Sequence, residues 1–471
     1  MDTSAITHLT AVGIADAVRG GTLTAAAVVD AHLTRIAAVN PDVNAVTVVL
    51  TDRAREAAAA LDSRISRGEN PGPLAGVPIS VKENIDLTWS ATTSGLPCYA
   101  GLVPRSNATF VQRALDAGAI PVARGNMPDV GLRWDTDNDL FGRTRNPWDA
   151  SRVPGGSSGG DAVAVATGMV AAGLGNDYGG SLRLPAHAAG VVALRPSAGR
   201  VTAPSRDVAE PVPLSLQAFA VNGPLARSVD DLDALFGVVH GADDRDPLSV
   251  TVPHPAAYDG PRRAAVTVDP AGWGVEPQVA DAVRRAADAL SAAGWEVEEA
   301  EPPLVERAAV LWRQLSATEM APALFTPGVF PGPLSAGTVQ YFRDNVAGVE
   351  LLDTSAAYQA AWAERFAIAS AWRAFSARYP VVLGPVVTER MPLVGYDLSG
   401  PEAVTAQWRS HRLLVIANFL GLPAVAVPTG VVDGAPQGVQ VIAGLHRDHV
   451  ALAAARAIEA AGTPLTPIDP R

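Results

Sequence analysis

Apolar residues near the N-terminus recur at helical spacing and predict two helices, over residues 24–39 and 52–67. Thr24 is placed to cap the first helix, which should stop at Asn40-Pro41, and Gly68 should end the second. Strand-like and helical patterns then alternate, which predicts an α/β sheet with helices packed on it. The expected elements here are strand 77–81, helix 108–117, strand 120–123 and helix 160–172.

The pattern changes near residues 240–263, which are rich in Pro, Asp and Gly and indicate the start of an insertion. A β-α-β unit is predicted next, with strands 263–268 and 295–297 around helix 279–293. Residues 321–338 carry four prolines and three glycines and predict a loop. Strands return at 381–383, 424–427 and 439–442, and Asp448 should cap a closing helix.

Four tryptophans lie in helical stretches around the predicted 321–338 loop. Core packing is the favoured interpretation, and the alternative is that some of them line an apolar pocket. They are Trp312, Trp362, Trp372 and Trp408.

Composition narrows the possible classes of protein. With 471 residues, 48% of them hydrophobic, the chain can build a large core. The net charge is −12 and no basic block stands out, which argues against nucleic acid or anionic lipid as a partner. The single cysteine, Cys98, cannot form an internal disulfide or a cysteine-built metal site. Uncharged runs at 320–342 and 413–432 are interrupted by prolines, so neither predicts a membrane helix.

The N-terminus shows no signal-peptide pattern, and together with the low cysteine content this predicts a cytoplasmic protein. No cofactor and no metal site are predicted.

The basic residues contain one informative exception. Of the 36 lysines and arginines, only Lys82 is a lysine. An arginine is essentially always charged, whereas a buried lysine can lose its proton and act as a base. Lys82 follows alternating apolar residues at the end of a predicted strand, which favours a chemical role over the alternative of codon bias.

Two Gly-Gly-Ser turns separated by one helix form the densest candidate site, at 155–160 and 175–183. Glycines beside a serine let backbone N–H groups point at a ligand. Two tight turns without a ligand remain an alternative. A phosphate loop is excluded because no Gly-Lys-Ser/Thr follows. A nucleophile elbow served by a distant histidine, and a serine activated by Lys82, both remain open at this point.

These motifs resemble the amidase signature family. The likeness covers about residues 10–240 and 380–460, and the Ser-Ser and Gly-Gly-Ser-x-Arg motifs with an upstream lysine are specific in combination. The matching stretches are Gly72–Pro78, Lys82–Asn84, Thr92–Gly95, Asn126–Pro128, Phe141–Asp149, Gly155–Gly160, Asp177–Pro185, Gly223–Val229, Gly421–Ala424 and Gly438–Gln440.

The resemblance implies a Ser–Ser–Lys triad. Ser181 would be the nucleophile, Ser157 the bridging serine after a cis peptide bond from Gly156, and Lys82 the base. Burial would have to lower the pKa of Lys82, so the expected activity optimum is neutral to alkaline.

The resemblance also assigns the surrounding residues. The backbone N–H groups of Tyr178, Gly179, Gly180 and Ser181 would form an oxyanion hole. Tyr178 stands where many members of the family have a small or β-branched residue. Gly131, Leu132 and Trp134 should face the acyl group, and structural support is expected from Ser158, Asp177 and Arg183.

The implied fold is α/β, a large twisted mixed β-sheet flanked by helices, with a helical and loop insertion that caps the active site. The expected segments are an N-terminal helical region (1–65), the signature core (66–240), a variable insertion (241–379) and the C-terminal part of the core (380–471).

The implied function is hydrolysis of a small aryl or alkyl amide through an acyl-enzyme, with carbamates and esters as related substrates. The alternative is the glutaminase subunit of a tRNA-dependent amidotransferase, which acts with a second protein. Otherwise a monomer or a homodimer is expected, with a small-molecule substrate and neither nucleic acid nor membrane as a partner.

Overall fold

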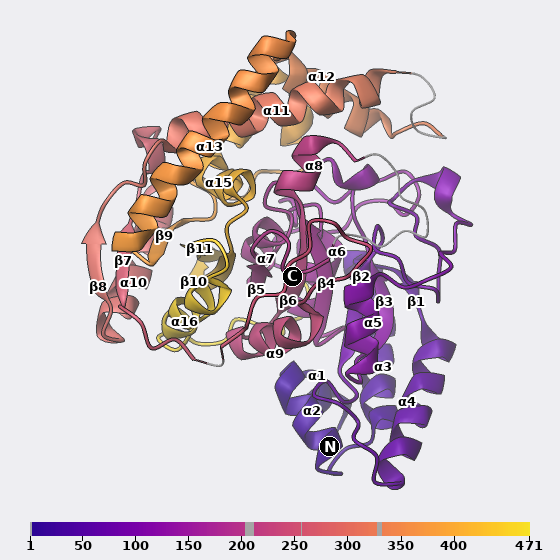
Figure 1. Ribbon diagram of the computed structural model, residues 1–471. Coiled ribbons are helices and arrows are strands. Elements are labelled where there is room, and N and C mark those ends of the chain that lie inside the picture. The colour runs from indigo at the N-terminus through magenta and orange to yellow at the C-terminus, as the bar shows by residue number, and fades with distance from the viewer. Residues whose placement is uncertain (1, 203–211, 256, 327–331) are drawn as a thin grey trace.

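A single mixed sheet forms the centre of the molecule (Figure 1). The computed structural model describes residues 2–202, 212–255, 257–326 and 332–471. Within these residues eleven strands join in the order β1-β3-β2-β4-β6-β5-β10-β11-β9-β7-β8. The strands are β1 (Val46–Val49), β2 (Pro78–Lys82), β3 (Ile120–Gly125), β4 (Ala172–Asp177), β5 (Val192–Arg195), β6 (Val221–Ala226), β7 (Arg263–Val266), β8 (Glu296–Glu299), β9 (Val381–Pro385), β10 (Ala424–Val432) and β11 (Ala435–Ala443).

Helices surround this sheet. The α-helices are α1 (Thr3–Thr7), α2 (Ala11–Arg19), α3 (Ala25–Val43), α4 (Thr51–Ser66), α5 (Thr109–Asp116), α6 (Gly159–Ala166), α7 (Arg183–Ala189), α8 (Leu214–Phe219), α9 (Val229–Val239), α10 (Pro277–Ala292), α11 (Val305–Phe325), α12 (Ala336–Ala347), α13 (Ser355–Arg378), α14 (Pro401–Ser410), α15 (Arg412–Leu420) and α16 (Asp448–Glu459). Short 3₁₀ turns are η1 (Pro97–Tyr99), η2 (Asp129–Gly131), η3 (Pro270–Gly272) and η4 (Tyr396–Leu398).

Strand direction changes across the sheet. β2 runs parallel to both β3 and β4, and β7 runs parallel to both β8 and β9. The strands between these two groups pair antiparallel, from β4 through β6, β5, β10 and β11 to β9. Central strands such as β2, β3 and β5 are buried along their whole length, which explains their nearly continuous apolar sequences.

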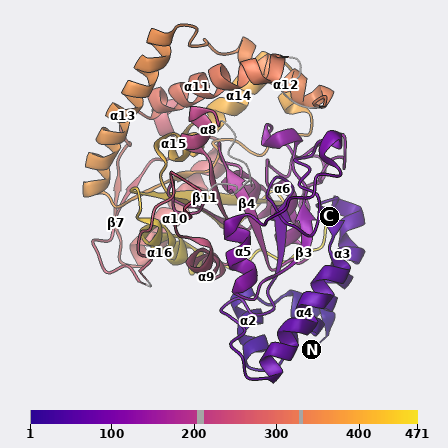
Figure 2. The ribbon, with the colours of Figure 1, turned by 45° about the vertical axis from the view of Figure 1, so that its right-hand side comes forward.

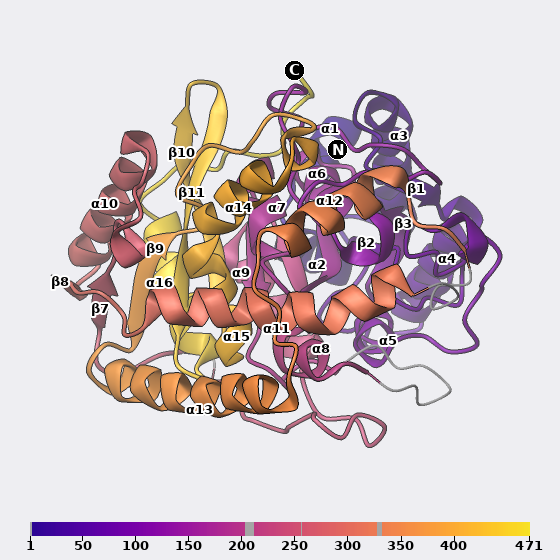
Figure 3. The ribbon, with the colours of Figure 1, turned by 90° about the horizontal axis from the view of Figure 1, so that it is seen from above.

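Four groups of helices lie around the sheet. α9, α16 and α10 pack in a row, and α6 and α7 pack on each other and on the central strands. α3 and α4 lie side by side at the N-terminal end of the molecule (Figure 2). α11, α12 and α14 lie together on the side nearest the viewer in Figure 3, with α13 alongside α11.

Residues 241–379 contribute to the sheet as well as to this helical group. β7 pairs with β9 and β8 pairs with β7, so the segment supplies the last two strands at one edge. Among its described residues the segment also forms η3, α10 and the helices α11–α13. The sheet therefore continues across the expected segment boundaries, which remain predictions.

Two helix boundaries differ from expectation because proline is tolerated near a helix end. α3 continues through Pro41 to Val43, and α11 includes Pro322, so residues 321–325 are helical and not a loop. Proline has a backbone φ compatible with a helix and removes only one hydrogen bond there. The expected loop 321–338 is also wrong at its end, where α12 begins at Ala336. Its residues 327–331 lie outside the described residues.

Two other expectations fail because of tertiary contacts. The predicted helix 160–172 ends at Ala166, where Gly168, with φ +71°, turns the chain toward β4. The apolar residues at 162–166 and 169–172 fit helix and buried strand equally, so their pattern could not place this boundary. Asp448 does not cap α16, because its carboxylate accepts hydrogen bonds from the backbone and hydroxyl of Ser197.

No helix in the described part of the chain is long and apolar enough to cross a membrane.

Candidate active site

The candidate site begins at the carboxyl ends of two neighbouring parallel strands. Lys82 is the last residue of β2, and Asn176 lies next to the end of β4. Val81 is in register with Leu174, so both strands deliver their polar residues to the same edge of the sheet. Groups that act on a ligand commonly collect at such an edge in α/β proteins.

Lys82 is fully buried and is hydrogen-bonded to two polar side chains. Its Nζ lies 2.7 Å from Ser157 Oγ and 2.7 Å from Asn176 Oδ1. Burial lowers the pKa of Lys82 from 10.5 to about 7, against the opposing charges of Asp161 and Asp177. A substantial fraction of this amine is therefore neutral near pH 7.

A buried carboxyl group accompanies this amine. Asp161 lies on α6, and its Oδ1 accepts a hydrogen bond of 2.7 Å from Ser80 Oγ on β2. Burial raises the pKa of Asp161 to about 7, and the neighbouring Lys82 charge opposes that change.

Three serines of the two Gly-Gly-Ser turns lie in this region, and one of them, Ser157, contacts Lys82. The peptide bond between Gly156 and Ser157 is cis, as expected. The N–H of Ser158 donates to the carbonyl oxygen of Ser181 at 3.2 Å, which ties the two Gly-Gly-Ser turns together. Ser157 is 1% exposed, whereas Ser181 is 5% exposed and lines a cavity. Among the hydrogen bonds of the described residues, none joins the hydroxyls of Ser157 and Ser181.

The loop before Ser181 is organised by Asp177. The Asp177 carboxylate accepts hydrogen bonds from the N–H groups of Gly180, at 2.8 Å, and Leu182, at 3.2 Å. The Gly180 amide, expected to face an oxyanion, is thus already engaged inside the loop. Across the described residues no acceptor is recorded for the N–H groups of Tyr178, Gly179 and Ser181.

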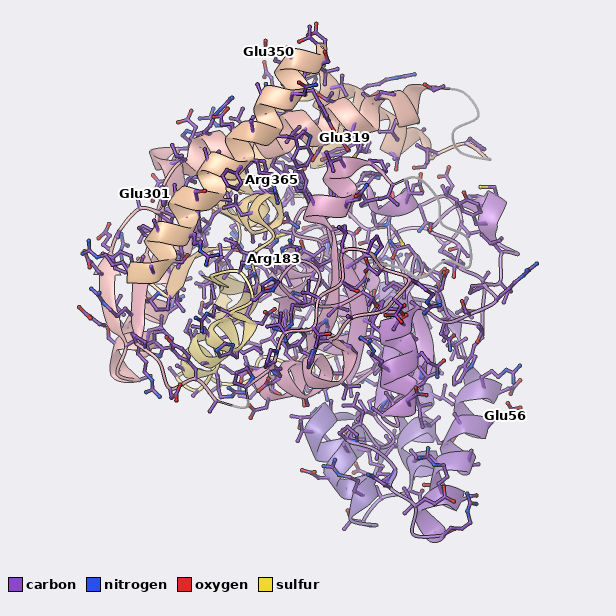
Figure 4. All side chains as sticks on the ribbon, in the orientation of Figure 1. Glu56, Arg183, Glu301, Glu319, Glu350 and Arg365 are labelled. Carbon is purple, nitrogen blue, oxygen red and sulfur yellow. The ribbon has the colours of Figure 1, made fainter. Side chains whose placement is uncertain are left out.

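A buried ion pair fixes this loop. Arg183 Nε and Nη2 each lie 3.1 Å from an Asp177 oxygen, and Arg183 appears near the centre of the molecule in Figure 4. Arg183 also donates to Asn418 and Gln440 in the C-terminal part of the chain. The guanidinium groups of Arg183 and Arg195 hold the pKa of Asp177 well below its usual range, despite burial.

Ser181 opens into a cavity of about 550 Å³, including its mouth. The expected acyl-facing residues Gly131, Leu132 and Trp134 all line this cavity. The remaining lining comes from the Tyr178 loop, α11, α12 and α14. It comprises Arg133, Tyr178, Gly179, Trp312, Arg313, Ser316, Ala317, Met320, Tyr341, Phe342, Asn345 and Trp408.

Aromatic rings pack beside the serine loop. Trp134 Nε1 donates to the Gly179 carbonyl at 2.9 Å, and its ring stacks on Trp312 with centroids 6.4 Å apart. A Cβ on Gly179 would lie 2.6 Å from Trp312 Cζ2, so only glycine allows this approach. Gly131 has φ +79°, and a Cβ there would lie 3.2 Å from Ser157 Oγ.

The Tyr178 side chain points from the serine loop toward α8 and α11. Its hydroxyl is hydrogen-bonded to Ser316 on α11 at 2.7 Å and to Ser215 on α8 at 3.1 Å. Burial raises the pKa of Tyr178, so the phenol stays protonated. The unusual tyrosine of this loop therefore connects it to α8 and α11.

Sequence reasoning missed several residues of the site. Asn176 carried no signal beyond its place in the glycine-rich turn 175–183, and Asp161 looked like an ordinary residue of a helix. Of the four tryptophans with a possible pocket role, Trp312 and Trp408 line the cavity, whereas Trp372 is 1% exposed in the core. The other contributors from α11 and α12 lie in the variable segment, where no motif marked them.

The sheet, its helices and the buried lysine–serine cluster define an α/β protein with groups suited to hydrolysis. The chain belongs to the amidase family, whose model matches residues 27–452. This membership confirms the predicted family, the predicted fold with its large mixed sheet, and the predicted class of enzyme, an amidase.

Individual relatives extend this finding. The chain is 38% identical over 455 residues to an indoleacetamide hydrolase of Bradyrhizobium diazoefficiens, covering 95% of this chain and 86% of that protein. It is 33% identical over 450 residues to a glutamyl-tRNA(Gln) amidotransferase subunit of Geobacillus stearothermophilus, covering 89% and 90%. Among solved structures, a 6-aminohexanoate cyclic dimer hydrolase in complex with substrate is similar, with a TM-score of 0.83, 29% identity and 97% coverage of both chains.

Proposed function

We propose that this amidase hydrolyses a small amide with an aromatic acyl group through an acyl-enzyme on Ser181. The observation that carries the proposal is the buried contact of 2.7 Å between Lys82 Nζ and Ser157 Oγ, beside a cavity that Ser181 lines. A neutral amine in contact with a hydroxyl is a base that can activate a serine.

The proposed reaction begins with proton transfer. Neutral Lys82 takes the proton of Ser157, which takes the proton of Ser181 as Ser181 Oγ attacks the amide carbon. The oxyanion accepts hydrogen bonds from the free loop amides, those of Tyr178, Gly179 and Ser181. As the intermediate collapses, Ser157 gives its proton to the leaving amine and takes one back from the Lys82 ammonium, which leaves Lys82 neutral again. Water then attacks the ester on Ser181, and the acid and the free serine are released.

The cavity supports an aromatic acyl group. Trp134 and Trp312 stack beside the serine loop, and Met320 and Phe342 add apolar surface from α11 and α12. Flat rings packed in this way favour a flat apolar ligand. The similarity to an indoleacetamide hydrolase supports the same substrate class. Carbamates and esters with such acyl groups are related substrates of the same mechanism.

A glutaminase subunit is the second candidate, supported by the likeness to glutamyl-tRNA(Gln) amidotransferase subunits. Glutamine carries an ammonium group, and a charge buried in a site is normally paired with an opposite charge. The cavity lining, all of it within the described residues, contains no Asp or Glu. This favours the stand-alone amidase. Cytoplasmic location and assembly as a monomer or homodimer remain predictions.

A substrate panel tests the proposal. The purified chain is given phenylacetamide, a nitroanilide, a nitrophenyl ester, an aryl carbamate and glutamine. We expect turnover of the aryl amides without glutamine hydrolysis, and loss of at least about 10³-fold in kcat for Ser181→Ala. Lys82→Arg should also lose activity because arginine does not deprotonate. Glutamine turnover exceeding that of every aryl amide would favour the second candidate, and an active Ser181→Ala would overturn the mechanism.

A further inference from the structure

The cavity next to Ser181 is positively charged, although the whole chain is acidic. Two arginines, Arg133 and Arg313, line it, and none of its lining residues is acidic. The chain carries a net charge of −12, so this local excess of positive charge runs against the overall balance. The two arginines differ in how their charge is compensated.

Arg133 is neutralised by the protein. Its Nε and Nη2 lie 2.9 and 3.1 Å from the two carboxylate oxygens of Asp397, which is itself buried. A carboxylate oxygen of Asp135 also lies 3.7 Å from Nη2 of Arg133. Such a two-pronged pair satisfies a guanidinium without any ligand.

Arg313 has no comparable partner. Its side chain on α11 is 4% exposed, yet it forms no ion pair with any carboxylate of the described residues. Nε donates to Asn345 Oδ1 at 3.1 Å, and Nη2 donates to the Asn345 carbonyl and to Thr405 Oγ1, both at 3.2 Å. No hydrogen bond of the described residues involves its Nη1.

The surroundings of Arg313 hold the guanidinium in place. The Arg313 side chain lies over the ring of Trp408, with the guanidinium carbon 5.0 Å from the ring centre. Tyr341 lines the same cavity, and its hydroxyl has no hydrogen bond among those of the described residues. Burial lowers the pKa of Arg313, which reflects the cost of holding this charge out of water. An anion from outside would relieve that cost.

We propose that Arg313 binds a carboxylate of the substrate, so that the physiological amide carries an acidic group remote from its scissile bond. This inference rests on the proposed function, because it places the amide at Ser181 and the acid at the α11–α12 side of the same cavity. Nη1 of Arg313 and the free hydroxyl of Tyr341 are the donors that the structure offers to it. A guanidinium recognises a carboxylate through charge-assisted hydrogen bonds, which are stronger than neutral ones.

A matched pair of substrates tests this assignment. Phenylacetamide is compared with its para- and meta-carboxylate derivatives. We expect the wild-type kcat/KM to be at least about tenfold higher for one of the carboxylates than for the neutral amide. Arg313→Gln should lower kcat/KM for that carboxylate by about 10- to 100-fold more than for the neutral amide, mainly through KM. Arg313→Lys should retain part of the preference.

Arg365→Gln is the control. Arg365 on α13, labelled in Figure 4, also lacks an ion pair among the described residues, but it packs on Trp362, Phe219 and Phe419 and is not among the residues that line the cavity. We expect this variant to keep the wild-type preference for the carboxylate.

Binding to the inactive Ser181→Ala protein, measured by calorimetry, separates this inference from the proposed function. The carboxylates should bind more tightly than phenylacetamide, and Ser181→Ala/Arg313→Gln should lose that difference. Equal affinity of Ser181→Ala for the neutral and acidic amides would overturn the carboxylate site. So would an equal loss of affinity for both amides in the double variant. Failure of hydrolysis with the binding preference intact would overturn only the proposed chemistry.

Discussion

Asn176 shows how a single residue can set the protonation state of the proposed base. Its Oδ1 lies 2.7 Å from Lys82 Nζ, and its Nδ2 donates to Asn84 Oδ1 at 2.9 Å. An amide oxygen at that distance accepts a hydrogen bond without adding a charge, which lets burial keep the pKa of Lys82 low. A carboxylate in the same place would stabilise the protonated amine.

We therefore predict that Asn176→Asp shifts the pH dependence of kcat/KM. The wild-type rate should rise with pH through about 7, because the reactive form of Lys82 is the neutral one. The new carboxylate raises the pKa of Lys82, so the rising limb should move by at least about one pH unit toward alkaline pH. Asn84→Asp, one hydrogen bond further away, should cause a smaller shift. An unchanged limb in Asn176→Asp would mean that Lys82 is not the titrating base.

At this scale the sequence predicted residues with distinctive chemistry and missed those whose role depends on position. Lys82 stood out as the single lysine, and Ser157 and Ser181 lay in paired glycine-rich turns. Asn176 and Arg313 are ordinary residue types whose significance comes from the groups that the fold brings beside them.

At the scale of secondary-structure elements, Tyr178 links the serine loop to α11 and α8. We predict that Tyr178→Phe lowers the free energy of unfolding by about 1–2 kcal/mol, because it leaves the hydroxyls of Ser215 and Ser316 without their partner. kcat should change by less than about tenfold, since the proposed contribution of Tyr178 to the reaction is its backbone N–H. Urea unfolding and steady-state kinetics measure the two effects.

Ser316→Ala provides the matched partner for this test. If the hydroxyl contact is the source of the stabilisation, the double variant Tyr178→Phe/Ser316→Ala should be less destabilised than the sum of the two single variants. Strict additivity would contradict a direct contact between the loop and α11.

The location of most elements could be predicted from hydrophobic spacing, but several of their ends could not. α4 and α10 begin and end within two residues of the expected positions, because Gly68 and Gly294, both with positive φ, are local signals for their ends. α11 extends through Pro322 because packing of its other face, including Trp312 and Leu315, outweighs one lost hydrogen bond. Such packing involves residues distant in sequence, so a local pattern does not contain it.

At the scale of the whole molecule, the buried group around Asp177 joins two distant parts of the chain. Arg183 connects Asp177 to Asn418 on α15 and to Gln440 on β11, and Asn418 Nδ2 donates directly to Asp177 Oδ1 at 2.7 Å. The signature core and the C-terminal segment are thus held together beneath the serine loop. The sequence predicted the Asp177–Arg183 pair but not its partners, which lie more than 230 residues away.

We predict that Asp177→Asn destabilises the protein by about 3–5 kcal/mol at pH 7, because the charges of Arg183 and Arg195 remain buried without a counter-ion. The folded-state pKa of Asp177 is depressed, so its contribution is present above the unfolded value near ~4 and is lost as the pH falls. Urea unfolding at pH 7, 4 and 3 should therefore show a difference between wild type and variant that is nearly constant down to about pH 4 and shrinks below it. Asp30→Asn, which removes an exposed ion pair with Arg55, should change stability little at any of these pH values. A difference that stays constant down to pH 3 would show that the Asp177 carboxylate acts through its shape and hydrogen bonds, and not through its charge.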